Sequence, residues 1–307
     1  MATKQHGSQS SQNPQGLQGS QTLQGLRRRA AGVRLLATDL DGTLLDRTHS
    51  LSAENKAALS ELARKGVVLA AATGRSRTSI PEAVTALEGL KYLITANGAK
   101  IYENGTEKIL YESYLSAEAV DYIRPFLSDR EVLCEVFWDG APHVEEARYK
   151  GAPEYGIPFW FSDYFFSSRL PIRDFEAAVR AHENEIENIN FVFANETVKE
   201  RIRQWLKARE GLYELTTSLA FNFEIGGLGV CKAAAVDFIA KRESVRPEET
   251  ICFGDNDNDI SMIEYAGIGI AAANGVDEAL AAADFVTKDC GQSAVAYALK
   301  TLGLIAG

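Results

Sequence analysis

Hydrophobic residues along the chain form short, nearly unbroken runs separated by stretches with helical spacing. The runs at 33–38, 67–72 and 92–96 predict strands that are buried on both faces. Between the first two runs, apolar positions with helical spacing predict a helix over 52–64, and a second helix is expected near 77–88. Such strand–helix–strand alternation is typical of a parallel sheet covered by helices on both faces.

The C-terminal third repeats this pattern, so the two ends of the chain are expected to build one core. The fold class predicted is α/β, with a Rossmann-like, doubly wound parallel sheet. The expected helices lie near 231–242, 258–265, 276–282 and 292–302, and the expected strands at 250–253, 268–271 and 285–287.

The middle of the chain has a different composition. Residues 98–224 hold 22 of the 28 aromatic residues and include the alternating run 131–138, which is followed by the hairpin signal Asp139-Gly140. We expect an α+β domain here, inserted between core segments 31–97 and 225–307. Linkers are expected near 97–99 and 222–229, and the Pro-containing stretch 151–166 is expected to be a loop that sets substrate specificity.

The N-terminal residues 1–30 are predicted to be a disordered tail. The first 26 contain seven Gln, four Gly and four Ser and no aromatic residue. A segment of this kind buries too little apolar surface to offset its chain entropy.

The net charge of −10 disfavours nucleic acid and anionic membranes as partners. A phosphorylated ligand would therefore need local positive charge from a metal, a lysine or backbone N–H groups. No signal or membrane segment is visible, and the four widely spaced cysteines form no C-x-x-C pair. These features predict a cytoplasmic protein, and no pattern in the sequence addresses its oligomeric state.

The first chemical motif is Asp39-Leu40-Asp41-Gly42-Thr43, directly after the first predicted strand. Active sites of parallel sheets lie beyond the carboxyl ends of the strands. Two aspartates at i and i+2 lie on the same side of an extended chain, so one can attack phosphorus while the other transfers protons. Alone, the motif would also suit a solvated Asp-Gly turn.

A second acidic segment, Gly254-Asp255-Asn256-Asp257-Asn258-Asp259, follows the strand expected at 250–253. Its oxygen ligands suit Mg²⁺, which takes a few carboxylates together with water and substrate oxygens. An EF-hand is excluded, because Ile260 stands where that loop needs Gly and Ala266 where it needs Glu.

Two further features are weak when taken singly. Thr73-Gly74-Arg75 follows the second predicted strand and could bind phosphate oxygens, although a helix cap is the simpler interpretation of Thr73 alone. Lys232 begins a predicted helix and could neutralise a phosphoryl group, although most lysines are solvated surface charges.

Together and in this order, the four features resemble the motifs of the haloacid dehalogenase-like phosphohydrolase superfamily over about residues 33–304. The insertion between the second and third motifs resembles the caps of the Cof-type sugar-phosphatase branch, as do Ala96-Asn97-Gly98-Ala99 and Gly229-Val230-Cys231-Lys232. Cys231 stands where Ser is common and Ala233 where Gly is common, and neither departure removes a catalytic group.

The resemblance implies a Mg²⁺-dependent phosphatase acting on a small phosphorylated metabolite through an aspartyl-phosphate. Asp39 would be the nucleophile and Asp41 the proton donor and acceptor, while the inserted domain would close over the site as a cap. The implied metal ligands are Asp39, the carbonyl of Asp41, Asp255 and Asp259, and the implied phosphate or substrate contacts are Thr73, Gly74, Arg75, Lys232, Asn97 and Asn258.

Single features of the sequence also suit other functions. Gly267 to Ala272 fits G-x-G-x-x-A, but these glycines open a strand, whereas the dinucleotide motif follows one. A phosphosugar mutase remains an alternative, because an aspartyl-phosphate can pass to a hydroxyl. A phosphate-binding or regulatory module without turnover also remains, and Asp41 discriminates against it, since a phospho-acceptor needs no acid/base group.

Overall fold

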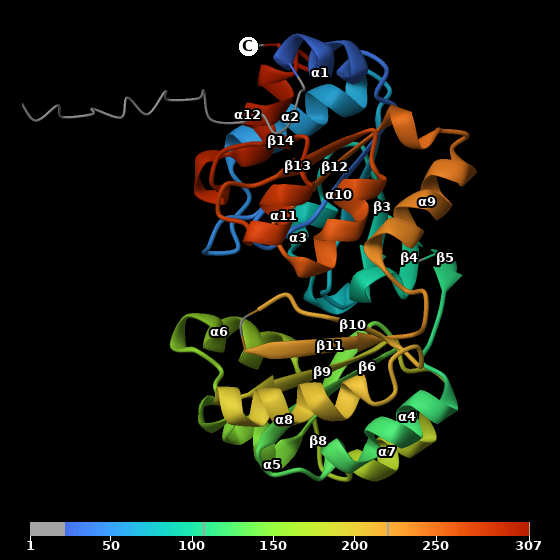
Figure 1. Ribbon diagram of the computed structural model, residues 1–307, viewed down its shortest axis with the longest axis vertical. Coiled ribbons are helices and arrows are strands. Elements are labelled where there is room, and N and C mark those ends of the chain that lie inside the picture. The colour runs from blue at the N-terminus through green and yellow to red at the C-terminus, as the bar shows by residue number, and fades with distance from the viewer. Residues whose placement is uncertain (1–21, 107, 220, 307) are drawn as a thin grey trace, which may run out of the picture.

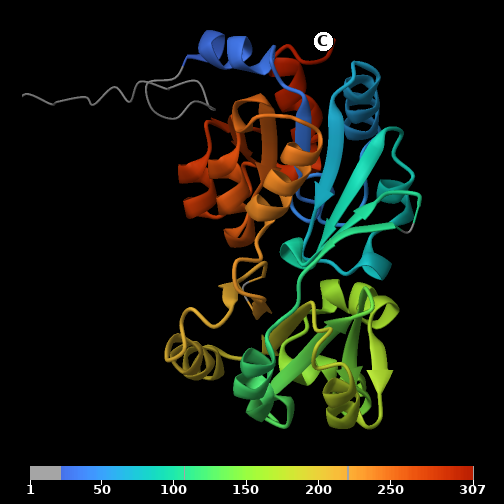
Figure 2. The same ribbon diagram turned by 90° about the vertical axis from the view of Figure 1, so that its right-hand side faces the viewer.

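The chain folds into two sheets that lie one above the other in Figures 1 and 2. This computed structural model describes residues 22–106, 108–219 and 221–306. The first sheet has the strand order β14-β13-β12-β1-β2-β3-β4-β5 and is parallel from β14 to β3, which confirms the predicted α/β class. Its strands are β1 (Leu35–Thr38), β2 (Val68–Ala72), β3 (Leu90–Thr95), β4 (Lys100–Glu103), β5 (Lys108–Glu112), β12 (Thr250–Gly254), β13 (Ile268–Ala271) and β14 (Phe285–Val286).

Helices cover both faces of this sheet because alternate strand residues are apolar on both sides. In β1, Leu36 packs into the cluster that includes residues of α2 (Ala53–Arg64) and α12 (Ala294–Thr301). Leu35 and Ala37 pack into the cluster that includes residues of α9 (Lys232–Arg242) and α10 (Ile260–Tyr265). The helices of this domain are α1 (Leu23–Ala30), α2 (Ala53–Arg64), α3 (Glu82–Thr85), α9 (Lys232–Arg242), α10 (Ile260–Tyr265), α11 (Asp277–Ala282) and α12 (Ala294–Thr301).

The end of the predicted disordered tail is helical, which corrects that prediction. Helix α1 begins after Thr22, whose side chain accepts a hydrogen bond from the backbone N–H of Gly25. Leu26 and Ala30 are buried against the first sheet, so tertiary packing stabilises a segment that composition alone would leave unfolded. The first 21 residues of the predicted tail lie outside the described residues.

Two other predictions near the first sheet were wrong. Strands β4 and β5 pair antiparallel beyond β3, so the domain boundary predicted at residue 98 falls inside the first sheet. The helix expected over 77–88 is only a 3₁₀ turn (Arg77–Ser79) and the single turn of α3. Pro81, between them, has no N–H to continue a helix.

The second sheet is built from the inserted residues, in the order β10-β11-β9-β6-β7-β8. Asp139 and Gly140 both have positive φ and form the predicted turn between β6 and β7. Its strands are β6 (Val132–Trp138), β7 (Ala141–Glu145), β8 (Leu170–Ile172), β9 (Asn188–Phe193), β10 (Glu214–Thr216) and β11 (Asn222–Gly226), and its helices are α4 (Ala117–Ile123), α5 (Glu146–Lys150), α6 (Phe159–Ser168), α7 (Phe175–Ala181) and α8 (Glu196–Lys207). We call this part the cap.

The two faces of the cap sheet differ in chemistry. Val136, Phe191 and Ile225 belong to the apolar cluster that contains α4, α7 and α8 residues. The alternate residues of the same strands lie on the opposite face, and several of them line a cavity shared with the first domain. The stretch predicted as a loop at 151–166 contains a 3₁₀ turn (Ala152–Tyr155) and most of α6, so that prediction was wrong.

The remaining 3₁₀ turns lie at junctions between larger elements. They are Ala96–Gly98, Arg124–Leu127, Pro247–Glu249, Asp257–Asp259 and Cys290–Gln292. Strand β11 takes up the start of the linker predicted at 222–229, so the return to the first domain is made by the few residues between β11 and α9.

Candidate active site

The predicted chemical motifs meet at the carboxyl ends of three adjacent strands. Asp39 follows β1, Thr73 follows β2 and Asp255 follows β12, and these strands are neighbours in the sheet. Because the strands are parallel, their carboxyl ends share one edge, which is where ligands bind in open α/β sheets.

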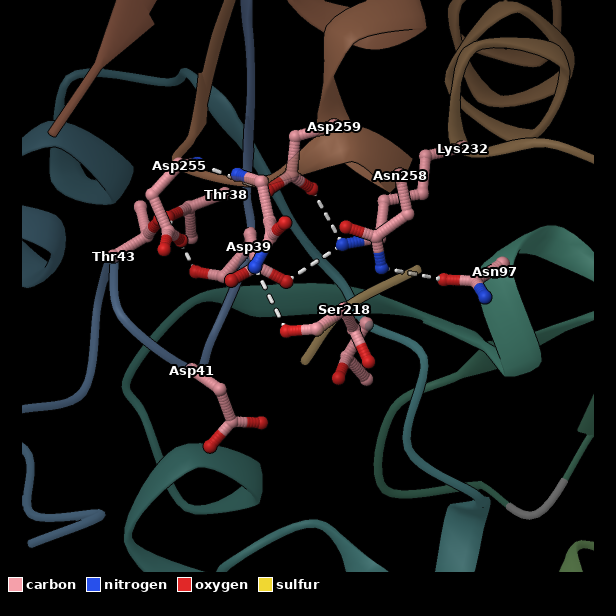
Figure 3. Close-up of polar contacts among 12 residues, drawn as sticks. Thr38, Asp39, Asp41, Thr43, Asn97, Ser218, Lys232, Asp255, Asn258 and Asp259 are labelled. Carbon is pink, nitrogen blue, oxygen red and sulfur yellow. Dashed lines mark hydrogen bonds and ion pairs between the residues drawn. The ribbon is translucent and has the colours of Figure 1, made fainter. Parts of the chain in front are cut away.

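A buried lysine joins two of the predicted metal ligands. The Nζ of Lys232, at the first position of α9, donates to Oδ1 of Asp39 at 2.6 Å and to Oδ1 of Asp259 at 2.5 Å (Figure 3). Lys232 and Asp259 are fully buried and Asp39 is nearly so. Two charge-assisted bonds therefore fix the position of the predicted nucleophile.

The loop after β12 is held by its own side chains. Oδ2 of Asp259 accepts the backbone N–H groups of Asp255 and Asn256, and the hydroxyl of Thr43 donates to Oδ1 of Asp255 at 2.6 Å. Gly42 permits this approach, because its φ is +84° and a Cβ on it would lie 2.4 Å from Oδ2 of Asp255.

Asp39, Asp255 and Asp259 form a site that fits a divalent cation. Each offers a carboxylate oxygen within 4.8 Å of the other two. Burial, reinforced by the charge of Asp259, raises the pKa of Asp39 well above its ordinary value and that of Asp255 to about 7. The three side chains carry more formal negative charge than Lys232 neutralises, and their oxygen atoms are the ligands that Mg²⁺ prefers.

Asp41 lies apart from this cluster and points away from it (Figure 3). Its two oxygens accept hydrogen bonds from Nε and Nη2 of Arg75, each at 2.6 Å, and Nδ1 of His49 lies 2.9 Å from Oδ1. Although burial acts in the opposite direction, Arg75 and His49 together lower the pKa of Asp41 below its ordinary value. In this arrangement Asp41 is a carboxylate.

The predicted phosphate contacts lie beside the carboxylate cluster. Thr73 is buried, and its hydroxyl accepts the backbone N–H of Arg75 at 3.1 Å. The Nδ2 of Asn258 donates to Oδ1 of Asn97 at 3.0 Å, and a Cβ on Gly74 would lie 3.1 Å from Oε2 of Glu224 and 3.2 Å from Oδ1 of Asn97. Hydroxyl, amide and backbone N–H groups therefore gather at the edge where Lys232 supplies positive charge.

A cavity of about 590 Å³ separates these residues from the cap. On its cap side, the sequence pointed only to the stretch 151–166, and the strand residues were not predicted. The cap contributes Glu135, Asn190 and Glu224 from three strands, together with the aromatic residues Phe161 and Tyr164 of α6. The sequence carried a signal for the strand residues, since each is a polar residue flanked on both sides by an apolar one. It carried none for His49, whose contact with Asp41 is a tertiary one.

Fold and site together define a phosphohydrolase with a capped α/β core. The haloacid dehalogenase-like hydrolase family matches residues 36–299, and the chain belongs to this family.

Among the part of the chain that the structure describes, no helix is both long and apolar enough to cross a membrane.

Known proteins similar to this chain are phosphatases. Phosphatase YwpJ of Bacillus subtilis is 30% identical over 88% of this chain and 100% of its own length. The 5-amino-6-(5-phospho-D-ribitylamino)uracil phosphatase YcsE of the same organism is 27% identical over 90% of this chain and 98% of its own. The structure of the subclass IIB sugar phosphatase BT4131 has a TM-score of 0.74 and 26% identity, over 89% of this chain and all of that one. The chain is accordingly a phosphoric monoester hydrolase of the Cof-type branch.

Proposed function

We propose that this protein is a Mg²⁺-dependent phosphatase that hydrolyses a small phosphorylated metabolite through an aspartyl-phosphate on Asp39. The observation that carries the proposal is the convergence of Asp39, Asp255 and Asp259 around the buried Lys232. The names of the similar proteins, which include a sugar phosphatase and a phosphoribityl-compound phosphatase, support this substrate class.

Asp39 acts as the nucleophile in this proposal. Lys232 fixes one of its oxygens and balances part of the charge that attack on a phosphoryl dianion brings together. Thr73, Gly74 and Asn258 contribute hydroxyl, backbone and amide donors for the phosphoryl oxygens. Phosphoryl transfer depends mainly on such positioning and charge neutralisation, which suits a site with many fixed donors.

Asp39, Asp255 and Asp259, with the backbone carbonyl of Asp41, are the groups proposed to hold Mg²⁺. When bound there, the ion supplies charge neutralisation between the nucleophile and the phosphoryl oxygens. Thr43 keeps Asp255 oriented toward that position.

Asp41 transfers protons in the proposed reaction. In the arrangement described above it is ion-paired with Arg75 and can accept a proton but has none to donate. Donation to the leaving oxygen therefore requires Asp41 first to lose the pair with Arg75 and take up a proton from solvent, which it then passes to that oxygen. A substrate phosphoryl group is itself a strong ligand for a guanidinium and would compete for Arg75.

The test is phosphate release from a panel of phosphorylated metabolites and from p-nitrophenyl phosphate, with Mg²⁺ or with excess EDTA, for the wild type and Asp39→Asn. We expect Mg²⁺-dependent turnover that the variant loses by at least a thousandfold. Asp174→Asn is the matched control, because Asp174 is an exposed cap residue whose helix-capping bond Asn also makes. Turnover that persists in Asp39→Asn, or that ignores EDTA, contradicts the proposal.

A further inference from the structure

Three polar side chains form a line across the middle of the cap sheet, on the face that lines the cavity. Glu135 of β6 is in register with Asn190 of β9, and Asn190 is in register with Glu224 of β11. All three are at least nine-tenths buried and all line the cavity above the carboxylate cluster. We call Glu135, Asn190 and Glu224 the polar row.

The Glu135 end of the polar row is neutralised. Arg169, between α6 and β8, donates from Nε to Oε1 of Glu135 at 2.7 Å and from Nη2 to Oε2 at 3.3 Å. Asn190 Nδ2 donates to the same Oε2 at 2.5 Å. The guanidinium of Arg169 is therefore already committed to a carboxylate inside the cap.

The Glu224 end is held by neutral groups. Its oxygens accept from the Asn222 amide at 3.1 Å, from the Ser218 hydroxyl and from the Asn97 amide, all of which are neutral. Among the residues that the structure describes, no cationic side chain forms an ion pair with Glu224. A buried carboxyl group held only by neutral donors has oxygen lone pairs left for further hydrogen-bond donors and offers no cationic partner to an anion.

The charged residues around the whole cavity also disfavour a second anionic group. Among the described residues, seven carboxylates and three arginines line it. Each arginine already pairs with a carboxylate: Arg47 with Asp289, Arg75 with Asp41 and Arg169 with Glu135. Among the described lining residues of the cap, polar side chains thus offer acceptors for hydroxyl groups, and Arg169 is already paired with Glu135 and not available to a second anionic group of the substrate.

We propose that the polar row selects the leaving group: it accepts hydrogen bonds from hydroxyls of an otherwise neutral leaving group and rejects leaving groups that carry a carboxylate or a second phosphate. This inference rests on the proposed phosphatase function and names the substrate class of that same site. Phe137 and Val192 lie two residues after Glu135 and Asn190 along β6 and β9, so they are on the same face of the sheet as the polar row. These two apolar side chains contact the carbon skeleton between the hydroxyls.

The first experiment uses matched substrate pairs in which one neutral hydroxyl-bearing group is exchanged for an anionic one. Glycerol 3-phosphate is compared with 3-phosphoglycerate, and glucitol 6-phosphate with 6-phosphogluconate, so that a hydroxymethyl group is replaced by a carboxylate. We expect the neutral member of each pair to have a kcat/KM at least tenfold higher. Where a pair is not turned over, its members are compared as competitive inhibitors of p-nitrophenyl phosphate hydrolysis, and the neutral member is expected to bind at least tenfold more tightly.

The second experiment tests Glu224 as the source of this selectivity. Glu224→Gln removes the charge, keeps the shape and leaves no buried cation without a partner. We expect the neutral-to-anionic ratio of kcat/KM to fall at least fivefold. Glu131→Gln is the matched control, since Glu131 precedes β6 on the exposed surface of the cap, and its ratio should equal that of the wild type.

The two proposals fail in different ways. If no substrate, including p-nitrophenyl phosphate, is hydrolysed in a way that depends on Mg²⁺ and on Asp39, the proposed function is overturned, and this inference with it. Hydrolysis that is present but equal for the two members of each pair overturns the inference alone. A ratio in Glu224→Gln that matches the Glu131→Gln control shows that the polar row has only a structural role.

Discussion

The buried lysine provides the sharpest test of how the site is held together. Lys232→Met keeps most of the side-chain stem but removes the charge that lies 2.6 Å from Asp39 and 2.5 Å from Asp259. Removing one partner of a buried ion pair costs about 3–5 kcal/mol, because the other charge stays buried without compensation. Since two carboxylates lose their cation here, we expect a loss of about 4 kcal/mol in the free energy of unfolding when Mg²⁺ is absent.

A divalent cation should restore part of this loss. Without Lys232 the carboxylate cluster is more negative, so the variant should bind Mg²⁺ more tightly than the wild type does. Ligand at about a hundredfold excess over its Kd stabilises a protein by about 2.7 kcal/mol, and the gain should be larger in the variant at the same Mg²⁺ concentration. Turnover should still fall by a factor of about 10²–10³, as expected for loss of a charge that stabilises the transition state.

The assay is urea unfolding followed by circular dichroism, in excess EDTA and in Mg²⁺. Lys91→Met is the control: Lys91 pairs with Glu243 at 2.7 Å but is 44% exposed, so its loss should cost no more than about 1 kcal/mol. Two results contradict this prediction. One is a Lys232→Met protein that is as stable in EDTA as the control, and the other is equal stabilisation of the variant and the wild type by Mg²⁺.

Four further predictions rest on the same contacts. Because the pKa of Asp255 is raised to about 7 without metal, its proton competes with Mg²⁺, and calorimetry should show Mg²⁺ affinity falling about tenfold per pH unit below pH 7; a pH-independent affinity contradicts this. In EDTA, the folded protein holds a proton on Asp255 at pH values where the unfolded protein has released it. Stability should therefore fall as pH rises from about 4 to 7, and urea titrations at several pH values check the sign. Gly42→Ala places a Cβ 2.4 Å from Oδ2 of Asp255 at a φ of +84°, so Mg²⁺ affinity should fall at least tenfold, and unchanged affinity argues against the close approach. Arg75→Lys cannot reproduce the two bonds to Asp41, so the pKa of Asp41 should rise and the acidic limb of the kcat profile should move to higher pH; an unmoved limb counts against the pairing.

The core strands were predictable because their signal is local. Runs such as 67–72 and 250–253 are apolar at successive positions, and a strand buried on both faces requires this. Once the strands are parallel, the residues that follow β1, β2 and β12 must share one edge. The neighbourhood of Asp39, Thr73 and Asp255 was therefore predictable from the order of elements alone.

Elements that depend on packing were not predictable. Helix α1 has a polar composition and is stabilised by the burial of Leu26 and Ala30 against distant segments. Strands β4 and β5 continue the first sheet although their composition resembles that of the cap. Helix α6, in a stretch with two prolines, is stabilised where Phe161 and Phe165 pack against the cap sheet. In each case tertiary burial outweighs local propensity.

The sequence by itself determined which chemical groups the protein has and at which edge of the sheet most of them lie. Only the tertiary structure decided their partners: Lys232 reaches Asp39 across 193 residues of chain, and Arg75 reaches Asp41 across 34. The polar row on the cap was likewise decided by the pairing of three strands distant in sequence. The physical reason is that the distance between charges, which sets their pKa and their attraction for ligands, depends on how the elements pack, and no local pattern encodes that distance.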